Sequence, residues 1–371
     1  MVYHSLVRPI LFRLPPETAH ELALHSLPFL KSFVGHPFES PMLNTDLFNL
    51  RFRNPVGLAA GFDKNGIALE SLAALGFGFI EAGTVTYHPQ PGNPKPRMFR
   101  LSEDQALINR AGFNNDGAAA FAKRVERQRP DCVLGISIGK SKITPLEHAT
   151  DDYLASFELV YKRADYIAIN VSSPNTPQLR ELQQSDQLTS LLLALQTRNR
   201  ELQKTASRPA PVPLLVKISP DLERRDLEMI VDAIQRLNID GIIATNTTVS
   251  RDNLRTDRAR VDACGEGGLS GKPLADRSTR MIAELYELTG GRIPLIGVGG
   301  IFTAEDAWEK ICAGASLVQL YTGFIYQGPG VVRQINQGLV RILEREGMKS
   351  IGEAVGCKVK QLLRKEPIIA G

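Results

Sequence analysis

The sequence predicts an α/β protein of the (β/α)8 (TIM) barrel class, preceded by an N-terminal amphipathic helical extension. Short apolar runs alternate with amphipathic helical stretches from Pro55 onward, a pattern typical of parallel βαβ units joined by right-handed crossovers. Eight such runs occur, which is the number of strands in the barrel. The alternative, an open doubly wound sheet, favours a G-x-G-x-x-G turn after its first strand, but that position reads Ala-Ala-Gly-Phe-Asp-Lys-Asn-Gly.

The predicted strands are runs of aliphatic and β-branched residues bounded by turn residues. They span Val56–Ala60, Phe79–Ala82, Leu134–Ile138, Tyr166–Asn170, Leu214–Ile218, Gly241–Thr245, Leu295–Val298 and Leu317–Tyr321. The predicted helices include Thr150–Arg163, Leu222–Asn238, Asp276–Leu288, Thr303–Ala313 and Val331–Glu346. A barrel enzyme carries its active site where the strands end, so the residues that follow each strand are the candidate site.

The first 40 residues form the helical extension. Apolar residues recur on one helical face over Val2–Leu14 and again over Glu17–Phe33, and Pro28 is expected to kink or interrupt the second helix. Two interpretations of the pair are open: it packs on the core, or it lies on a membrane surface. The chain is thus expected to comprise the extension (1–40), the barrel (41–346) and a basic helical tail (347–371).

Composition and charge exclude several functional classes. With 43% hydrophobic and 23% charged residues, the chain is neither disordered nor fibrous. A net charge of +4 is small for 371 residues, so no nucleic-acid partner is expected. The four cysteines and six histidines lack metal-ligand spacing, so no bound metal is expected. The sequence shows neither a continuous apolar run of membrane-spanning length nor a signal-peptide core.

Polar residues and glycines follow the predicted strands and favour an active site over a merely solvated rim. Tyr166–Pro177 shows the pattern best, because a buried strand runs into a polar loop stiffened by two prolines. Lys217 ends an apolar strand, where it could stabilise negative charge on a flavin or an oxyanion, or form a Schiff base. The glycines of Gly297–Gly300 favour a site for the phosphate of a substrate or a cofactor.

Six motifs resemble dihydroorotate dehydrogenase, in order and over nearly the whole chain. They are Ala-Ala-Gly-Phe-Asp-Lys at 59–64, Asn-Arg-Ala-Gly-Phe-Asn-Asn at 109–115, Asn-Val-Ser-Ser-Pro-Asn-Thr at 170–176, Ala-Thr-Asn-Thr-Thr at 244–248, Gly-Gly-Leu-Ser-Gly at 267–271 and Gly-Val-Gly-Gly-Ile at 297–301. The resemblance implies an FMN-dependent barrel that oxidises dihydroorotate to orotate in pyrimidine (UMP) biosynthesis. Ser173 occupies the base position, where the soluble fumarate- or NAD-linked class has cysteine, and thus indicates the quinone-linked, membrane-associated class.

The resemblance also implies roles for individual residues. Ser173 is the catalytic base that removes a proton from C5 of dihydroorotate while the C6 hydride passes to N5 of FMN. The implied substrate-binding residues are Lys64, Asn109, Arg110, Ala111, Gly112, Phe113, Asn170, Asn175, Asn246 and Thr247. The implied cofactor-binding residues are Ala60, Gly61, Phe62, Asp63, Lys64, Thr84, Ser137, Asn170, Lys217, Thr245, Gly271, Gly300, Tyr321 and Thr322. The implied quinone-site residues are His20, Arg100 and Tyr321.

One departure and three alternatives accompany this interpretation. The family usually has asparagine at the positions of Ser137 and Ser141. The quinone-linked class implies a monomer in peripheral contact with lipid at the cytoplasmic face of the inner membrane, with the N-terminal helices forming an apolar tunnel. The alternatives are a fumarate- or NAD-linked homologue, a flavin-free phosphate-binding barrel that acts as an isomerase or lyase, and a membrane-surface scaffold without catalysis.

Overall fold

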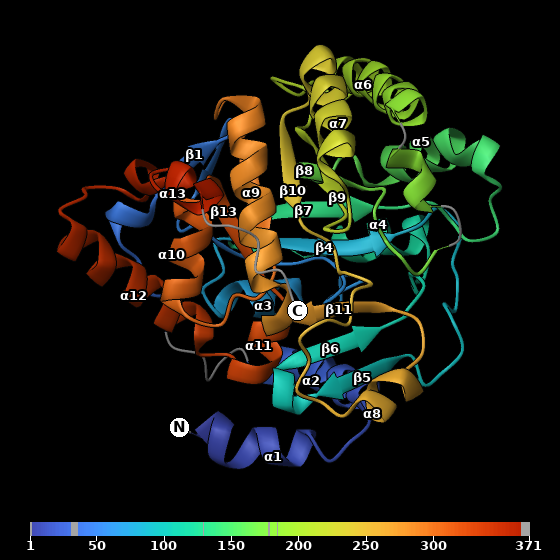
Figure 1. Ribbon diagram of the computed structural model, residues 1–371. Helices are drawn as coiled ribbons and strands as arrows, with labels where there is room; N and C mark the ends of the chain where they lie inside the picture. The colour runs from blue at the N-terminus through green and yellow to red at the C-terminus, as the bar shows by residue number, and fades with distance from the viewer. Residues whose placement is uncertain (1, 31–35, 129, 177–178, 184, 365–371) are drawn as a thin grey trace.

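Eight parallel strands close into a barrel at the centre of the computed structural model (Figure 1), which describes residues 2–30, 36–128, 130–176, 179–183 and 185–364. The barrel order is β3-β4-β7-β8-β9-β10-β12-β13. The strands are β3 (Val56–Leu58), β4 (Phe79–Val85), β7 (Val133–Ile138), β8 (Tyr166–Asn170), β9 (Leu214–Ile218), β10 (Gly241–Ala244), β12 (Leu295–Val298) and β13 (Ala315–Leu320). The predicted fold class is confirmed, and every predicted strand corresponds to one of these.

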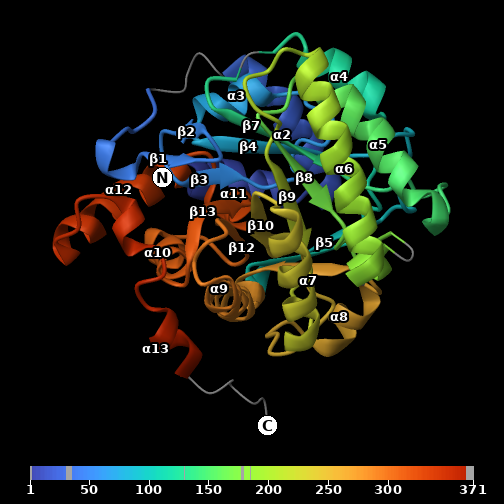
Figure 2. The ribbon, with the colours of Figure 1, turned by 90° about the horizontal axis from the view of Figure 1, so that it is seen from above.

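A layer of helices surrounds the barrel (Figure 2). They are α3 (Leu69–Ala74), α4 (Ala118–Val125), α5 (Ala149–Val160), α6 (Ser185–Thr205), α7 (Arg224–Leu237), α9 (Ala275–Thr289), α10 (Ala304–Cys312), α11 (Thr322–Gln327) and α12 (Val331–Glu346). Their buried aliphatic faces and the outward-facing strand residues form one continuous core. Helix α7 shows why the boundaries fall where they do: Glu223 and Asp226 form a capping box at its start, and Asn238 ends it in the left-handed conformation.

The inside of the barrel is apolar near the amino ends of its strands. A hairpin of β1 (Thr45–Leu47) and β2 (Leu50–Phe52) covers this end. Phe52 packs edge-on against Phe79 with ring centroids 5.5 Å apart, and Tyr166, Leu215 and Leu317 belong to the same cluster. Because side chains alternate along a strand, the next inward positions lie one layer nearer the carboxyl ends. Those positions carry the polar groups of the site.

A small antiparallel sheet lies at the carboxyl rim and was not predicted from the sequence. Its strands are β5 (Met98–Leu101), β6 (Ala106–Asn109) and β11 (Gly268–Gly271), and α8 (Arg258–Ala263) lies beside it (Figure 1). The register pairs Asn109 with Met98 on one side and with Gly268 on the other. The sheet thereby brings the second and the fifth of the sequence motifs together over the barrel mouth.

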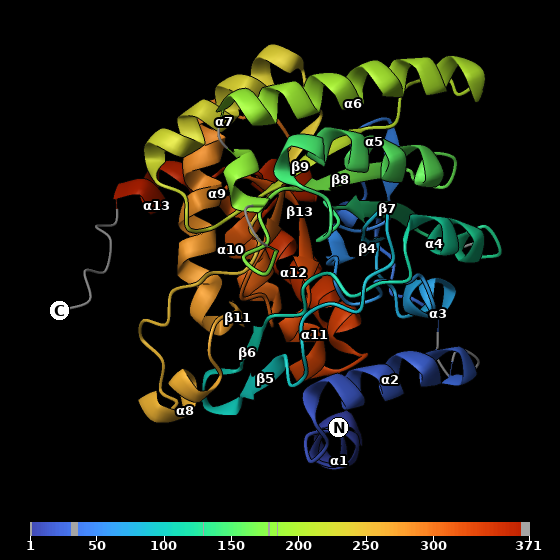
Figure 3. The same cartoon turned by 90° about the vertical axis from the view of Figure 1, so that its right-hand side faces the viewer.

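The N-terminal extension lies at one end of the molecule, beside α11 and the small sheet (Figure 3). It consists of a π-helical turn (η1, Tyr3–Val7), α1 (Arg8–Leu11) and α2 (Pro16–Leu30). Helix α2 continues through Pro28, so Pro28 does not interrupt it, whereas the alternative of a kink stays a prediction. A proline in the last turn removes only one intrahelical hydrogen bond. No helix in the described ranges has the length and apolar character to cross a bilayer.

The C-terminal tail is short and partly helical in the described range. It contains a 3-10 turn (η8, Ile351–Ala354) and α13 (Val359–Arg364), which packs against α9. Phe33, Pro177 and the tail residues 365–371, which the sequence predictions include, lie outside the described residues.

Candidate active site

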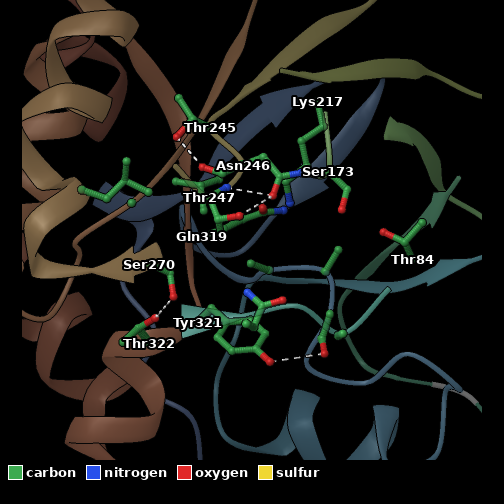
Figure 4. A pocket seen from close by; sticks show the side chains of 18 of the residues that line it. Thr84, Ser173, Lys217, Thr245, Asn246, Thr247, Ser270, Gln319, Tyr321 and Thr322 are labelled. Carbon is green, nitrogen blue, oxygen red and sulfur yellow. Dashed lines mark hydrogen bonds between the residues drawn. The ribbon is translucent and has the colours of Figure 1, made fainter. Parts of the chain in front are cut away.

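A cavity that spans about 1020 Å³, open solvent at its mouth included, lies at the carboxyl rim of the barrel (Figure 4). Its wall combines strand ends with the small antiparallel sheet. Most of the predicted substrate and cofactor residues line it, namely Ala60, Gly61, Lys64, Thr84, Asn109, Ala111, Gly112, Phe113, Asn170, Ser173, Asn175, Lys217, Thr245, Asn246, Thr247, Gly271, Gly300, Tyr321 and Thr322. The structure thus brings together residues that are up to 262 positions apart in the sequence, from Ala60 to Thr322.

Asparagine side chains form a hydrogen-bonded group around one part of the cavity. The Asn170 amide nitrogen donates to the Thr84 hydroxyl (2.9 Å), and the Asn246 amide nitrogen donates to the Asn170 carbonyl oxygen (3.2 Å). Across the mouth, the Asn175 amide nitrogen donates to the Asn109 carbonyl oxygen (3.2 Å). Each amide keeps further donor or acceptor capacity. Such a group suits a planar ligand that carries alternating N–H and C=O groups.

The loop that follows β8 holds Ser173 against the cavity wall. The Ser173 side chain is nearly buried, with 5% exposure, and its oxygen accepts a hydrogen bond from the Asn175 backbone N–H (3.3 Å). The Tyr153 hydroxyl donates to the Asn170 backbone carbonyl (2.8 Å), and the Arg180 guanidinium donates to the Ser172 carbonyl (3.3 Å). The backbone on both sides of Ser173 is therefore anchored, which fixes where its hydroxyl lies.

Lys64 supplies a positive charge at the edge of the cavity. Removal of its ammonium group from bulk water lowers the pKa of Lys64 to about 8, although the nearby Glu17 carboxylate favours the charged form. At pH 7 the ammonium is still mostly charged. It can therefore pair with an anionic group of a ligand, and it loses that ability a short way into the alkaline range.

The floor of the cavity contains an ion pair between Lys217 and Glu81. The sequence predicted a role for Lys217 only. The Lys217 ammonium lies 3.4 Å from a carboxylate oxygen of Glu81, which is fully buried. The other Glu81 oxygen accepts hydrogen bonds from the Gln319 amide (2.8 Å) and the Tyr166 hydroxyl (3.1 Å). Glu81 and Gln319 were missed because each sits inside an apolar strand, and only the closed barrel shows that both face its axis.

Glycines line the side of the cavity near β12 and β13. Gly300 has φ +71°, and a Cβ on it would lie 2.4 Å from the Ala275 side chain. A Cβ on Gly323 would lie 1.9 Å from the Ile301 carbonyl oxygen. Close backbone approach leaves main-chain N–H groups, together with the Thr322 hydroxyl, as the groups a ligand meets here. This is the chemistry expected of a phosphate site.

Ser270 is a further cavity residue that was not singled out in the sequence. Its hydroxyl lies 2.8 Å from the Thr322 hydroxyl, on the side of the cavity opposite Thr84 in Figure 4. The motif Gly-Gly-Leu-Ser-Gly was recognised, but only the strand alternation of β11 tells which of its residues faces the ligand.

A second, largely apolar cavity lies under the N-terminal helices and spans about 1520 Å³, open solvent at its mouth included. Its lining includes His20 and Arg100, two of the residues for which a quinone-site role is expected, together with Phe62 and Met98. Burial among apolar side chains, with Lys64 nearby, lowers the pKa of His20 to about 4, so its ring is neutral at pH 7. Met98 lines both cavities, so the two are separated by little more than one layer of side chains.

Arg100 and Tyr321 differ in their relation to the apolar cavity. The Arg100 guanidinium stacks over the Phe12 ring at 4.6 Å and donates to the Leu14 carbonyl, so it holds the turn between α1 and α2. Tyr321 lines the rim cavity instead, and its ring meets that of Phe62 at 5.8 Å. Tyr321 thus contacts Phe62, which lines the apolar cavity, but is not itself among the lining residues of that cavity.

Arg110 is predicted to bind substrate, but its side chain points elsewhere. The guanidinium stacks over the Phe99 ring at 4.8 Å and donates to the backbone carbonyls of Cys264 and Pro96. Since Asn109 faces the cavity, the next residue along the chain turns its side chain away. Arg110 thus connects the small sheet to the loop after α8 through hydrogen bonds.

Three predicted cofactor residues also lie outside the rim cavity. Asp63 accepts hydrogen bonds from the backbone N–H groups of Ile67 and Ala68 (2.8 Å each) and so shapes the loop before α3. Phe62 faces the apolar cavity. Ser137 is fully buried, and its hydroxyl lies 2.9 Å from that of Thr84, through which it contacts the cavity wall.

Ser141, the second position that departs from the family pattern, also has a local role. Its hydroxyl accepts a hydrogen bond from the His88 backbone N–H (3.1 Å), and its own backbone N–H donates to the Asp152 carboxylate (2.8 Å). Ser141 thus ties the loop after β7 to α5 and to the segment after β4.

The fold and the rim cavity define a (β/α)8-barrel enzyme whose site has side chains and backbone suited to a planar heterocycle and a phosphate group. Residues 42–343 match the family model for dihydroorotate dehydrogenase. The chain belongs to the dihydroorotate dehydrogenase family.

Similar proteins cover nearly the whole chain. A protein of Gloeobacter violaceus named dihydroorotate dehydrogenase (quinone) is 51% identical over 96% of this chain and 99% of its own length. A protein of the same name from Mycobacterium tuberculosis is 49% identical over 95% of this chain and 98% of its own. The crystal structure of DHODH from Eimeria tenella in complex with ferulenol has a TM-score of 0.85 and 40% identity, and covers 92% of this chain and 95% of that one.

Proposed function

We propose that this chain oxidises dihydroorotate to orotate in de novo pyrimidine biosynthesis, with FMN as prosthetic group and a membrane quinone as electron acceptor. Members of its family are flavin-dependent, and the relatives from Gloeobacter violaceus and Mycobacterium tuberculosis carry quinone in their names. The observation that supports the proposal most directly is the pair of adjacent cavities, one lined by many polar side chains and one lined almost entirely by apolar ones, with Met98 in both linings. An enzyme that passes electrons from a polar substrate to a lipid-soluble acceptor needs both cavities. A fumarate- or NAD-linked enzyme, or an isomerase, does not need an apolar cavity.

The residues of the rim cavity fit FMN. Glycine backbone and the Thr322 hydroxyl would hold its phosphate, and Lys217 and Thr245 would contact its ring system. Gln319 lines the same cavity, and its amide oxygen has no hydrogen-bond partner among the residues that the structure describes. When bound, FMN would supply the acceptor for the hydride at C6 of dihydroorotate. The chain's own task is to orient the substrate, keep water out and accept the proton.

Substrate orientation falls to the asparagine side chains and Lys64. The amides of Asn109, Asn170, Asn175 and Asn246 can pair with the ring N–H and C=O groups, and the Lys64 ammonium pairs with the carboxylate. Ser173 removes the C5 proton. A serine hydroxyl is a weak base, so the proton must be passed on. The buried Thr176 hydroxyl on the same loop has no hydrogen-bond partner among the described residues and is available to a water that carries the proton away.

The proposal is tested by anaerobic mixing of the purified yellow protein with dihydroorotate. The flavin absorption band is expected to bleach, and adding a quinone is expected to restore it, whereas adding fumarate or NAD leaves it bleached. A colourless protein that stays colourless with FMN would contradict the dehydrogenase assignment. Recovery with fumarate or NAD would contradict the quinone assignment alone.

The affinity for orotate is expected to depend on pH through Lys64. Below pH 8 the ammonium is charged and pairs with the orotate carboxylate; above pH 8 it loses its proton, and the affinity falls about tenfold per pH unit. Fluorescence titration of the FMN-loaded protein with orotate between pH 7 and 9.5 measures this. Lys64→Arg should abolish the slope, because arginine stays charged throughout. An affinity of the wild type that is constant over this range would contradict the assignment.

The helical extension supports membrane association. The extension exposes several large apolar side chains, namely Val2, Leu6, Val7, Ile10, Leu22 and Phe29. We assign 1–40 to a lipid-facing entrance for quinone with His20 and Arg100 near the head group, 41–346 to the FMN barrel, and 347–371 to a basic tail. The protein is expected to act as a monomer that is peripheral to the cytoplasmic face of the inner membrane.

A further inference from the structure

The buried carboxylate of Glu81 determines how two cavity residues are oriented. It sits one layer above the apolar floor of the barrel and has no exposed surface. One oxygen faces the Lys217 ammonium, and the other accepts from Gln319 and Tyr166. A buried carboxylate needs positive charge and hydrogen-bond donors around it, and these three side chains supply them.

The Glu81 carboxylate fixes which end of the Gln319 amide faces the cavity. An ionised carboxylate only accepts hydrogen bonds, so the Gln319 NH2 group must point toward it. The Gln319 carbonyl oxygen then points the other way. That oxygen is buried, the side chain lines the rim cavity, and no partner for it exists within the described residues. A buried acceptor without a partner is costly, so a ligand donor is expected to meet it.

Lys217 and Gln319 therefore present complementary groups to the cavity. Both contact the same carboxylate, Lys217 through one oxygen and Gln319 through the other, so the two side chains are neighbours. Lys217 offers N–H donors, and Gln319 offers a carbonyl acceptor. A ligand edge that carries a C=O beside an N–H would satisfy both. The pyrimidine half of a flavin ring has such an edge at N3 and its adjacent carbonyls.

We propose that Gln319 and Lys217 together recognise the pyrimidine edge of the flavin, with the Gln319 oxygen accepting from N3–H and the Lys217 ammonium donating to an adjacent carbonyl. Glu81 is the positioning residue that sets the orientation of both. This inference rests on the proposed function, since it takes FMN as the ligand of the rim cavity. The inference makes Gln319 a determinant of cofactor specificity.

The test compares FMN with N3-methyl-FMN, which lacks the N–H, in equilibrium binding to the flavin-free full-length protein. The wild type is expected to bind FMN at least about 30-fold more tightly than the analogue, because the methyl group removes a donor and leaves the Gln319 oxygen unpaired. Gln319→Leu has a similar volume but no acceptor. It should weaken FMN binding about tenfold and leave only the steric part of the discrimination.

Two further variants complete the experiment. Gln334→Leu makes the same exchange at an exposed position of α12 and should leave both affinities unchanged. In Glu81→Gln the new amide can also donate, so the Gln319 amide is no longer held in one orientation, and the discrimination should fall. If Glu81→Gln does not fold, the Gln319→Leu comparison still decides the matter.

The outcomes separate this inference from the proposed function. If the wild type and Gln319→Leu show the same ratio of affinities for FMN and N3-methyl-FMN, the assignment of Gln319 is wrong although FMN binds. If the flavin-free wild type does not bind FMN at all, the proposed function itself fails.

Discussion

Replacing Ser173 by alanine is expected to slow flavin reduction by dihydroorotate about 10²- to 10⁴-fold, the usual contribution of a general base. Orotate affinity should stay within about threefold of the wild type, because the asparagine side chains and Lys64 hold the ligand without Ser173. Anaerobic stopped-flow absorbance gives the rate, and titration with orotate gives the affinity. A loss of rate without a loss of binding is what a base, and not a structural residue, would show.

Two further substitutions of serine residues serve as controls for this result. Ser190→Ala lies on the exposed face of α6 and should leave both quantities unchanged. Ser173→Cys should recover part of the rate with a different pH profile, because a thiol loses its proton more readily than a hydroxyl. Unaltered flavin reduction in Ser173→Ala would remove Ser173 from the mechanism.

The barrel could be predicted because each of its strands and helices has a sequence pattern that is visible within a short stretch of the chain. Each strand from Val56 to Leu320 is a buried apolar run, and each amphipathic helix shows its period within a short window. The small sheet could not be predicted in the same way. Its strands β5, β6 and β11 have four residues each, and β11 pairs with β6 across more than 150 residues of sequence. Nothing in the local pattern of Gly268–Gly271 indicates that partner.

The candidate site was predicted to a similar degree and for the same reason. Contiguous motifs contain most of the residues that line the rim cavity, but a motif does not tell which of its side chains face inward. Arg110 follows Asn109 directly and points away from it. Glu81 and Lys217 are 136 residues apart, so their contact follows only from barrel closure.

A long-range ion pair joins the helical extension to the substrate site. Arg97, only 6% exposed, donates from two nitrogens to the Glu17 carboxylate of α2 at 2.6 and 3.1 Å. Its third nitrogen donates to the backbone carbonyls of Pro91 (2.5 Å) and Asn93 (2.8 Å). The Asn93 amide in turn donates to the Asn175 carbonyl (3.4 Å), on the loop that carries Ser173. The position of α2 is thereby coupled to that loop.

The pKa of Glu17 reflects the strength of this ion pair. Burial alone would raise the pKa of Glu17, but the hydrogen bonds and charge of Arg97, with Lys95 and Lys64 nearby, hold it below its ordinary value. A carboxyl whose pKa is depressed in the folded state stabilises the fold above its unfolded pKa. That contribution is lost as the pH falls through the folded value. The link between α2 and the substrate loop should therefore persist at neutral pH and weaken in acid.

Arg97→Ala is expected to lower the free energy of unfolding by about 3 kcal/mol, because it leaves the Glu17 carboxylate and two backbone carbonyls without their donor. It should also raise the KM for dihydroorotate about tenfold, since the Asn175 loop loses its tether to α2. Chemical denaturation and steady-state kinetics measure the two effects. Arg163→Ala, which removes the exposed pair with Glu126, is the matched control and should change stability by less than about 1 kcal/mol and KM not at all. If Arg97→Ala lowers stability but leaves KM unchanged, the ion pair holds α2 in place without any influence on the substrate loop.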